Sequence, residues 1–129
     1  MSENHQKKFA GVWIDSVKAV IIAQDETESS AYKLHETVKG TSSHGAGSEH
    51  TMNNAKQADA LKYFKAVGTA LQPFDEILIF GPGQSQEQLQ HHLQGLVPFK
   101  NKKITLDTAG QLTDNQAIAT VRDFFKGRS

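Results

Sequence analysis

Two short runs of strand-forming residues follow a polar start. Residues 9–15 include Val12, Trp13 and Ile14, and residues 19–23 are continuously apolar. Only residues 16–18 separate the two runs, which leaves room for a turn and no more. Because β-branched and aromatic side chains favour strands, this pattern predicts a β-hairpin.

Apolar and polar residues then alternate over residues 31–39. Successive side chains of a strand point to opposite faces of the sheet. The alternation places Tyr32, Leu34 and Val38 on one face, and Lys33, His35, Thr37 and Lys39 on the other. It predicts a half-buried third strand.

The pattern changes to a helical period over residues 55–71. Apolar residues recur every three or four positions, at Ala58, Leu61, Phe64, Val67 and Leu71. This spacing predicts a helix with one buried face, which Pro73 ends. Residues 76–80 then form a continuous apolar run, which is typical of a strand buried on both faces.

The remaining segments predict a helix, a strand and a last helix. Ser85 with Gln88 has the spacing of a capping box, and so does Thr113 with Gln116. Each pair is expected to begin a helix. Residues 103–106 predict a short strand between these helices.

The order of elements is therefore three strands, a long loop, and then helix, strand, helix, strand, helix. Three antiparallel strands followed by a βαβ-like half favour an α/β fold with a mixed sheet flanked by helices, compatible with a ribonuclease H-like topology. Residues 1–8 are polar and are expected to be a flexible tail, so that residues 9–129 would form a single domain.

Composition removes several classes of function. Lys plus Arg number 14 and Asp plus Glu number 14, so overall charge gives no reason to expect nucleic-acid binding, and RNA contact needs a local basic patch. The absence of cysteine excludes disulfides and thiolate metal sites. Residues 1–8 hold no apolar signal core, and the apolar run 19–23 is too short to cross a membrane. We expect a cytoplasmic protein that does not enter membranes.

Residues 40–54 are the main candidate for a binding site, because they show no apolar period. Loops of this length in compact domains are usually functional or disordered. The candidate binding residues are His44, Gly45, Gly47, Ser48, Glu49 and His50. The glycines permit close approach of a partner, and the polar side chains can contact RNA phosphates or bases. The alternative is a surface loop without a partner.

Two further surfaces are candidates for binding phosphate. Gly81, Gly83 and Ser85 precede a helix N-terminus, where free amides favour an anion; the alternative is a sharp turn from strand to helix. A basic face would combine the cluster Lys100, Lys102 and Lys103 with Lys33, Lys39 and Arg122. The alternative is an ordinary solvated charged surface.

Metal-dependent chemistry has little support in the sequence. The spacing of His35, His44, Glu49 and His50 matches no metal signature, so neither a metal nor another cofactor is predicted. Asp15 raises the alternative of a nuclease, with Asp107 as a second carboxylate. The strand that ends at Gly81 supplies no third carboxylate, and Asp15 is expected to shape the hairpin instead.

Several segments, in order, resemble the central domain of the class-one peptide-chain release factors of archaea and eukaryotes and of Pelota. The matching segments are Val12-Trp13-Ile14-Asp15, Lys18-Ala19-Val20-Ile21, His44-Gly45-Ala46-Gly47-Ser48, Tyr63-Phe64 and Ile77-Leu78-Ile79-Phe80-Gly81-Pro82-Gly83. The chain is also similar to small stand-alone bacterial proteins described as translational machinery proteins, which share the start of the last helix, here Thr113-Asp114-Asn115-Gln116. This resemblance implies a ribonuclease H-like sheet and a role in translation.

Two departures from that family limit what the resemblance implies. Release factors carry Gly-Gly-Gln in the loop, and its glutamine helps water attack the peptidyl-tRNA ester; the comparable stretch here is Gly45-Ala46-Gly47-Ser48-Glu49. Relatives often place a lysine three residues after Gly-Pro-Gly, where this chain has Gln86. We therefore expect a non-enzymatic factor that binds the ribosome, tRNA or rRNA. The alternatives are a ribonuclease H-like nuclease and a small protein-binding module unrelated to translation.

Overall fold

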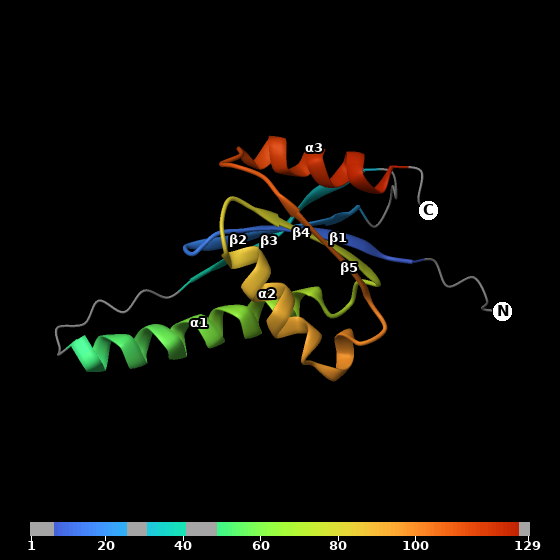
Figure 1. Cartoon of the computed structure of the whole chain (residues 1–129). Helices are drawn as coiled ribbons and strands as arrows, with labels where there is room; N and C mark the ends of the chain where they lie inside the picture. The colour runs from blue at the N-terminus through green and yellow to red at the C-terminus, as the bar shows by residue number, and fades with distance from the viewer. Residues whose placement is uncertain (1–6, 26–30, 41–48, 127–129) are drawn as a thin grey trace.

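The computed structural model describes residues 7–25, 31–40 and 49–126. Along the chain they form β1 (Phe9–Ile14), β2 (Lys18–Gln24), β3 (Tyr32–Lys39), α1 (Glu49–Leu71), β4 (Glu76–Gly81), α2 (Ser85–Gln94), a short 3-10 helix (Val97–Phe99), β5 (Lys103–Thr108) and α3 (Asp114–Phe125) (Figure 1). This order confirms the predicted succession of elements. Within the described residues, no helix is both long enough and apolar enough to cross a membrane.

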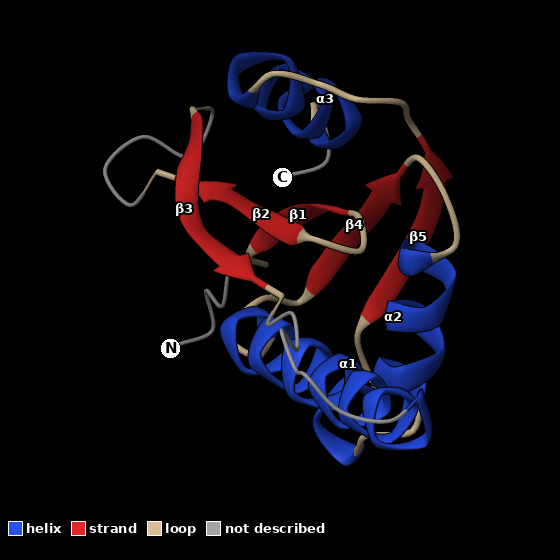
Figure 2. Ribbon diagram, turned by 90° about the vertical axis from the view of Figure 1, so that its left-hand side faces the viewer, coloured by secondary structure: helices blue, strands red, loops and turns tan. Residues whose placement is uncertain are grey.

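The strands form one mixed sheet in the order β3-β2-β1-β4-β5. The first three strands pair antiparallel, and β4 and β5 join parallel to β1. Figure 2 shows α1 and α2 against one face of the sheet and α3 against the other. The predicted mixed sheet with flanking helices is therefore confirmed, and its strand order is that of ribonuclease H-like folds.

Two apolar cores lie on the two faces of this sheet. The α1/α2-side core includes Ile14, Ile21, Val67, Ile79 and Leu89, and the α3-side core includes Phe9, Trp13, Phe80, Val121 and Phe125. All six residues of β1 and of β4 are buried, as the continuous apolar run of β4 predicted. These two adjacent strands have a helix layer on each side, which removes both of their faces from water.

The predicted faces of β3 were wrong. Ile21 pairs with Glu36 but Ile22 pairs with Leu34, which leaves His35 as the extra residue of a β-bulge. An extra residue resets the alternation of side chains. Tyr32 consequently packs on the α3-side core, whereas Val38 belongs to the α1/α2-side core.

The predicted start and buried face of α1 also need correction. The helix begins at Glu49, six residues before the predicted start. Residues 49–54 have no apolar period, so no signal in the sequence assigned them to the helix. They extend it nonetheless, because each residue added to a formed helix gains one backbone hydrogen bond at little cost. Tyr63, Val67 and Leu71 are buried, whereas Leu61, predicted to be in the core, is 59% exposed.

The two predicted capping boxes had different outcomes. At α3, the Gln116 amide donates to Thr113 Oγ1 at 3.1 Å and the Thr113 amide donates to Gln116 Oε1 at 2.9 Å, which confirms that box. At α2 the N-cap residue is Gln84 and no side chain caps the helix, so the Ser85 and Gln88 box was wrong.

The predicted N-terminal tail lies mostly outside the described residues, which begin at Lys7. Lys8, its last residue, is held by the start of β4. Its amide donates to Asp75 Oδ2 at 2.8 Å, and its carbonyl accepts from the amides of Asp75 and Glu76.

Candidate functional site

The candidate site lies at the end of the sheet where the parallel strands β1 and β4 have their C-terminal residues. The hairpin after β1 and the end of β3 lie at the same edge, because Lys18 at the start of β2 pairs with Lys39 at the end of β3. Figure 1 shows the first turns of α1 extending past the sheet on this side. In α/β sheets, ligands bind preferentially beyond the carboxyl ends of the parallel strands.

Asp15 shapes the hairpin at this edge. Its Oδ1 accepts hydrogen bonds from the amides of Val17 and Lys18, both at 2.8 Å, and its own amide donates to the Lys18 carbonyl at 3.0 Å. Such side-chain to backbone bonds are characteristic of Asp in tight turns. The structural role predicted for Asp15 is confirmed.

The chain leaves β3 through a tightly fitted glycine. The amide of Gly40 donates to the Val17 carbonyl at 2.7 Å. A Cβ atom at this position would lie 3.2 Å from the carbonyl oxygens of both Ser16 and Val17, and 3.6 Å from Cδ2 of Tyr63. The close contact of the β3 end with the hairpin therefore favours glycine here.

Tyr63 joins α1 to the hairpin. Its hydroxyl donates to the carbonyl oxygen of Asp15 at 2.9 Å, and the side chain is buried. Burial and, secondarily, the negative charge of Asp15 raise the pKa of Tyr63 well above its usual value of 10.0. The hydroxyl is therefore a neutral, fixed hydrogen-bond donor rather than a general base.

We call Asp15, Val17, Gly40 and Tyr63 together the loop base. Residues 41–48 follow Gly40 directly in the sequence, so the loop base holds the last described residue before them. Its polar contacts are internal, between turn, strand end and helix. The arrangement is suited to presenting an adjoining segment and contains no pair of nucleophile and base.

The predicted binding loop lies only partly within the described residues. His44, Gly45, Gly47 and Ser48 fall outside them. Glu49 and His50 belong to the first turn of α1, so they are helical and not part of a loop. Residues 49–54 of the predicted loop 40–54 are therefore helical.

The predicted anion-binding turn is held together by Gln86. Gln86 Nε2 donates to the Gly81 carbonyl at 2.8 Å, and its Oε1 accepts from the Gly83 amide at 3.3 Å. The Gly83 amide, which an anion would use, is therefore already hydrogen-bonded to Gln86. The Ser85 side chain does not cap the N-terminus of α2. A Cβ on Gly81 would lie 2.2 Å from the Ile14 carbonyl oxygen, so this glycine serves the contact between β4 and β1.

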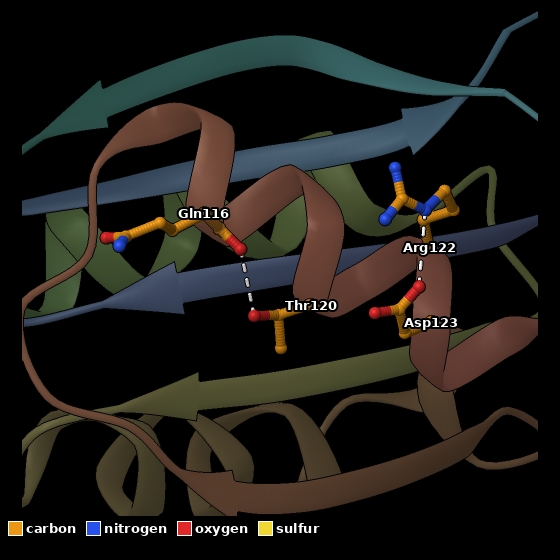
Figure 3. Close-up of polar contacts among 4 residues, drawn as sticks. All are labelled: Gln116, Thr120, Arg122 and Asp123. Atoms are coloured by element: carbon orange, nitrogen blue, oxygen red, sulfur yellow. Dashed lines mark hydrogen bonds and ion pairs between the residues drawn. The ribbon is translucent and has the colours of Figure 1, made fainter.

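The predicted basic face is not a single surface. Lys33 and Lys39 lie on β3, at the opposite edge of the sheet from β5 and its neighbouring lysines. Arg122 lies on α3, and its Nε is 3.2 Å from Asp123 Oδ1 (Figure 3).

Within the lysine cluster itself, Lys102 has a structural role. Its Nζ donates to the carbonyls of Gln72 and Phe74, both at 2.7 Å, just after α1 ends. It also lies 5.6 Å from the centre of the Phe99 ring. Lys100 and Lys103 are exposed and are the two members that remain open to solvent.

The carboxylates considered for a nuclease do not converge. Asp107 lies on β5, two strands away from β1, and its Oδ1 accepts from the Thr108 amide at 2.8 Å. Among the described residues, no group of three or more His, Asp or Glu side chains is placed to hold a metal ion. Asp15 is committed to its turn, as above.

Four residues of this region were not considered as site residues in the sequence analysis: Val17, Gly40, Tyr63 and Gln86. Gly40 and Gln86 were noted only as a loop boundary and as a departure from the family pattern. Tyr63 lies eight residues before the buried Leu71, a helical spacing that could have predicted its burial. The more regular apolar series through Leu61 obscured this signal.

Comparison with known proteins places this fold. No protein-family model matches the sequence, and no curated protein matches it. Among solved structures, the chain is similar to Pelota from Archaeoglobus fulgidus, with 11% identity, a TM-score of 0.62, and coverage of 95% of this chain and 32% of that one. Pelota from Thermoplasma acidophilum aligns with 16% identity and a TM-score of 0.57, covering 98% of this chain and 34% of Pelota.

The archaeal translation termination factor aRF1 is similar to the same extent, with 10% identity and a TM-score of 0.59 over 95% of this chain and 34% of aRF1. At these identities the likeness is one of fold. The chain spans about one third of each of these proteins. The predicted resemblance to the release factor and Pelota family is confirmed at the level of the fold.

Proposed function

We propose that this protein is a translation-associated factor of the cytoplasm that binds the ribosome or its RNA through the segment following Gly40. The observation that carries the proposal is the match of nearly the whole chain to one third of Pelota and of a translation termination factor. Because one fold hosts many functions, the proposal needs support from the site itself.

The loop base supplies that support. The Gly40 amide donates a 2.7 Å hydrogen bond to the Val17 carbonyl, and the Tyr63 hydroxyl connects the same turn to α1 by a hydrogen bond. Binding segments are commonly loops mounted on a rigid scaffold. The segment 41–48 contains three serines, two glycines and one histidine, a composition that suits close approach to a phosphate backbone.

The proposed action is binding without peptide release. The sequence from Gly45 to Glu49 contains no Gly-Gly-Gln, so it lacks the glutamine that the release-factor resemblance assigns to catalysis. At the loop base, the hydroxyl of Tyr63 is neutral and already donates to a backbone carbonyl. Neither feature offers a group that would activate water.

The test is co-sedimentation with purified ribosomes at low and high salt. One variant replaces residues 41–48 with a Gly/Ser linker of equal length and leaves Glu49 and His50 in place, because both belong to α1. The matched control replaces residues 26–30, which follow β2 at the opposite end of the hairpin, with the same type of linker.

We expect the parent and the control to sediment with ribosomes at low salt, less at high salt, and the 41–48 variant to remain in the supernatant with an unchanged Tm. Salt sensitivity follows from release of counterions from RNA phosphates. Equal binding by all three proteins would refute the assignment to this segment. Absence of binding by the parent at low salt would refute the function.

A further inference from the structure

Among the described residues no strand pairs with the outer edge of β5, which presents a short row of backbone groups. The amides of Lys103 and Ala109 donate inward, to the carbonyls of Asp75 and Gly81 beside β4. The backbone N–H and C=O groups of successive residues in a strand point alternately to its two sides. Those of Ile104, Leu106 and Thr108 therefore point outward, away from β4. The Thr108 amide already donates a hydrogen bond to Asp107 Oδ1 at 2.8 Å. Ile104 and Leu106 therefore form the open part of the edge.

The two sheet edges are protected to different degrees. β3 carries a bulge at His35 and a run of exposed residues, features that discourage pairing with another strand. β5 pairs with β4 in unbroken register from Lys103 to Thr108, and none of its residues is part of a bulge. Charges stand only near its ends, at Lys103 and Asp107.

We propose that the β5 edge is a homodimer interface, in which β5 pairs antiparallel with β5 of a second copy about a two-fold axis at Thr105. In this register Ile104 faces the partner's Leu106, and the two residues exchange backbone hydrogen bonds. The two-fold axis repeats the exchange, so all four outward groups of Ile104 and Leu106 become bonded in each copy. The pairing continues the five-stranded sheet across both molecules.

The side chains of β5 are self-complementary in this register. Lys103 lies opposite the partner's Asp107, and the two-fold axis repeats this pair of opposite charges. Both residues are exposed in the single chain. They share the α3 face of the sheet, because Asp107 is in register with Phe80 of the α3-side core. Opposite charges facing each other across an antiparallel pair stabilise it, and like charges destabilise it.

The other face has room for the apolar side chains. Ile104 and Leu106 are partly buried against the α1/α2-side core. A hollow of about 450 Å³ opens beside Ile104, lined also by Gln94, Phe99, Lys100 and Lys102. The partner's Leu106 faces Ile104 and would enter this hollow. Burial of apolar surface there would add to the backbone hydrogen bonds.

A cysteine scan tests the register directly, because the natural chain has no cysteine. In Thr105→Cys the two thiols meet at a non-hydrogen-bonded pair with Cα atoms about 4.5 Å apart, within the range a disulfide spans. In Lys103→Cys, the control, the thiols are four residues out of register and about 13 Å apart. Mild oxidation should cross-link the first variant and not the second. Equal cross-linking of both, or of neither, would overturn the proposal.

Charge exchange provides the second measurement, by light scattering with size-exclusion chromatography over a range of concentrations. Lys103→Asp and Asp107→Lys each place like charges opposite each other twice, and each should weaken dimerisation roughly tenfold or more. The double variant restores both opposite pairs and should recover the parent's dimer. Lys39→Asp, on the other edge strand, should have no effect. A parent that stays monomeric at every concentration, or a double variant no better than the single ones, would refute the interface.

Discussion

Replacing Lys102 with methionine should lower stability markedly, although the residue lies in a surface cluster of lysines. Its Nζ donates to two backbone carbonyls at 2.7 Å, those of Gln72 and Phe74. These groups follow the last turn of α1, where carbonyls lack helical partners and the helix dipole favours a positive charge. Methionine keeps an unbranched apolar side chain and removes the charge and the donors.

The expected loss follows from these contacts. Hydrogen bonds from charged donors contribute roughly 1.5–3 kcal/mol each when buried, and the bond to Gln72 is exposed. A discount for solvent screening leaves about 2 kcal/mol in total. For a chain of 129 residues this corresponds to a Tm lower by about 7 °C.

Thermal unfolding followed by circular dichroism measures this loss. Lys100→Met is the matched control, because its side chain is exposed, and it should change Tm by less than about 2 °C. If Lys102 instead binds a phosphate, Lys102→Met would leave Tm unchanged and weaken ribosome binding. That result would refute the structural role derived above.

Further predictions concern single groups. Tyr63→Phe removes one hydrogen bond and should lower the free energy of unfolding by about 1 kcal/mol in urea titrations; an unchanged value would show that the bond to Asp15 contributes nothing. Asp15→Ala should be less stable than Asp15→Asn, because asparagine keeps an acceptor for the turn amides. Mg²⁺ or Mn²⁺ should raise the Tm of neither the parent nor these variants. Cleavage of nucleic acid by the parent that is lost in Asp15→Asn would instead support the nuclease alternative. Burial lowers the pKa of His92 from 6.5, so its contribution to stability is complete above pH 6.5 and is lost as the pH falls through the lower folded pKa; His92→Phe should flatten this acid dependence, and an identical pH profile would contradict the assignment. Burial, with the charge of Glu76, raises the pKa of Tyr32 from 10.0 to about 12, so stability should be complete below pH 10 and fall as the pH rises toward 12; the tyrosine absorbance change at alkaline pH, compared with Tyr32→Phe, checks it.

Local signals in the sequence were sufficient for most of the fold. The apolar run of β4, the hairpin around Asp15 and the capping box of Thr113 each depend on residues close together in the chain, and all three are confirmed. The ordered set of motifs also led to the release factor and Pelota fold, which the solved structures confirm.

Predictions based on spacing failed where a distant contact decided the outcome. Alternation placed Tyr32 and Val38 together, but the bulge at His35 separates them, and a bulge depends on the partner strand. The helical series through Leu61 was regular, yet the sheet buries the series through Tyr63. Periodicity identifies an element, whereas its neighbours decide which of two similar faces is buried.

The sequence by itself determined the order of elements, the buried strands and the lack of a Gly-Gly-Gln, because each is a property of neighbouring residues. Only the tertiary structure decided the roles of Lys102 and Tyr63. Lys102 is 28 residues from Phe74, and Tyr63 is 48 residues from Asp15, and each side chain bonds a backbone carbonyl. Every residue except proline offers the same backbone groups, so the sequence carries no mark of such a partner until folding brings it within reach.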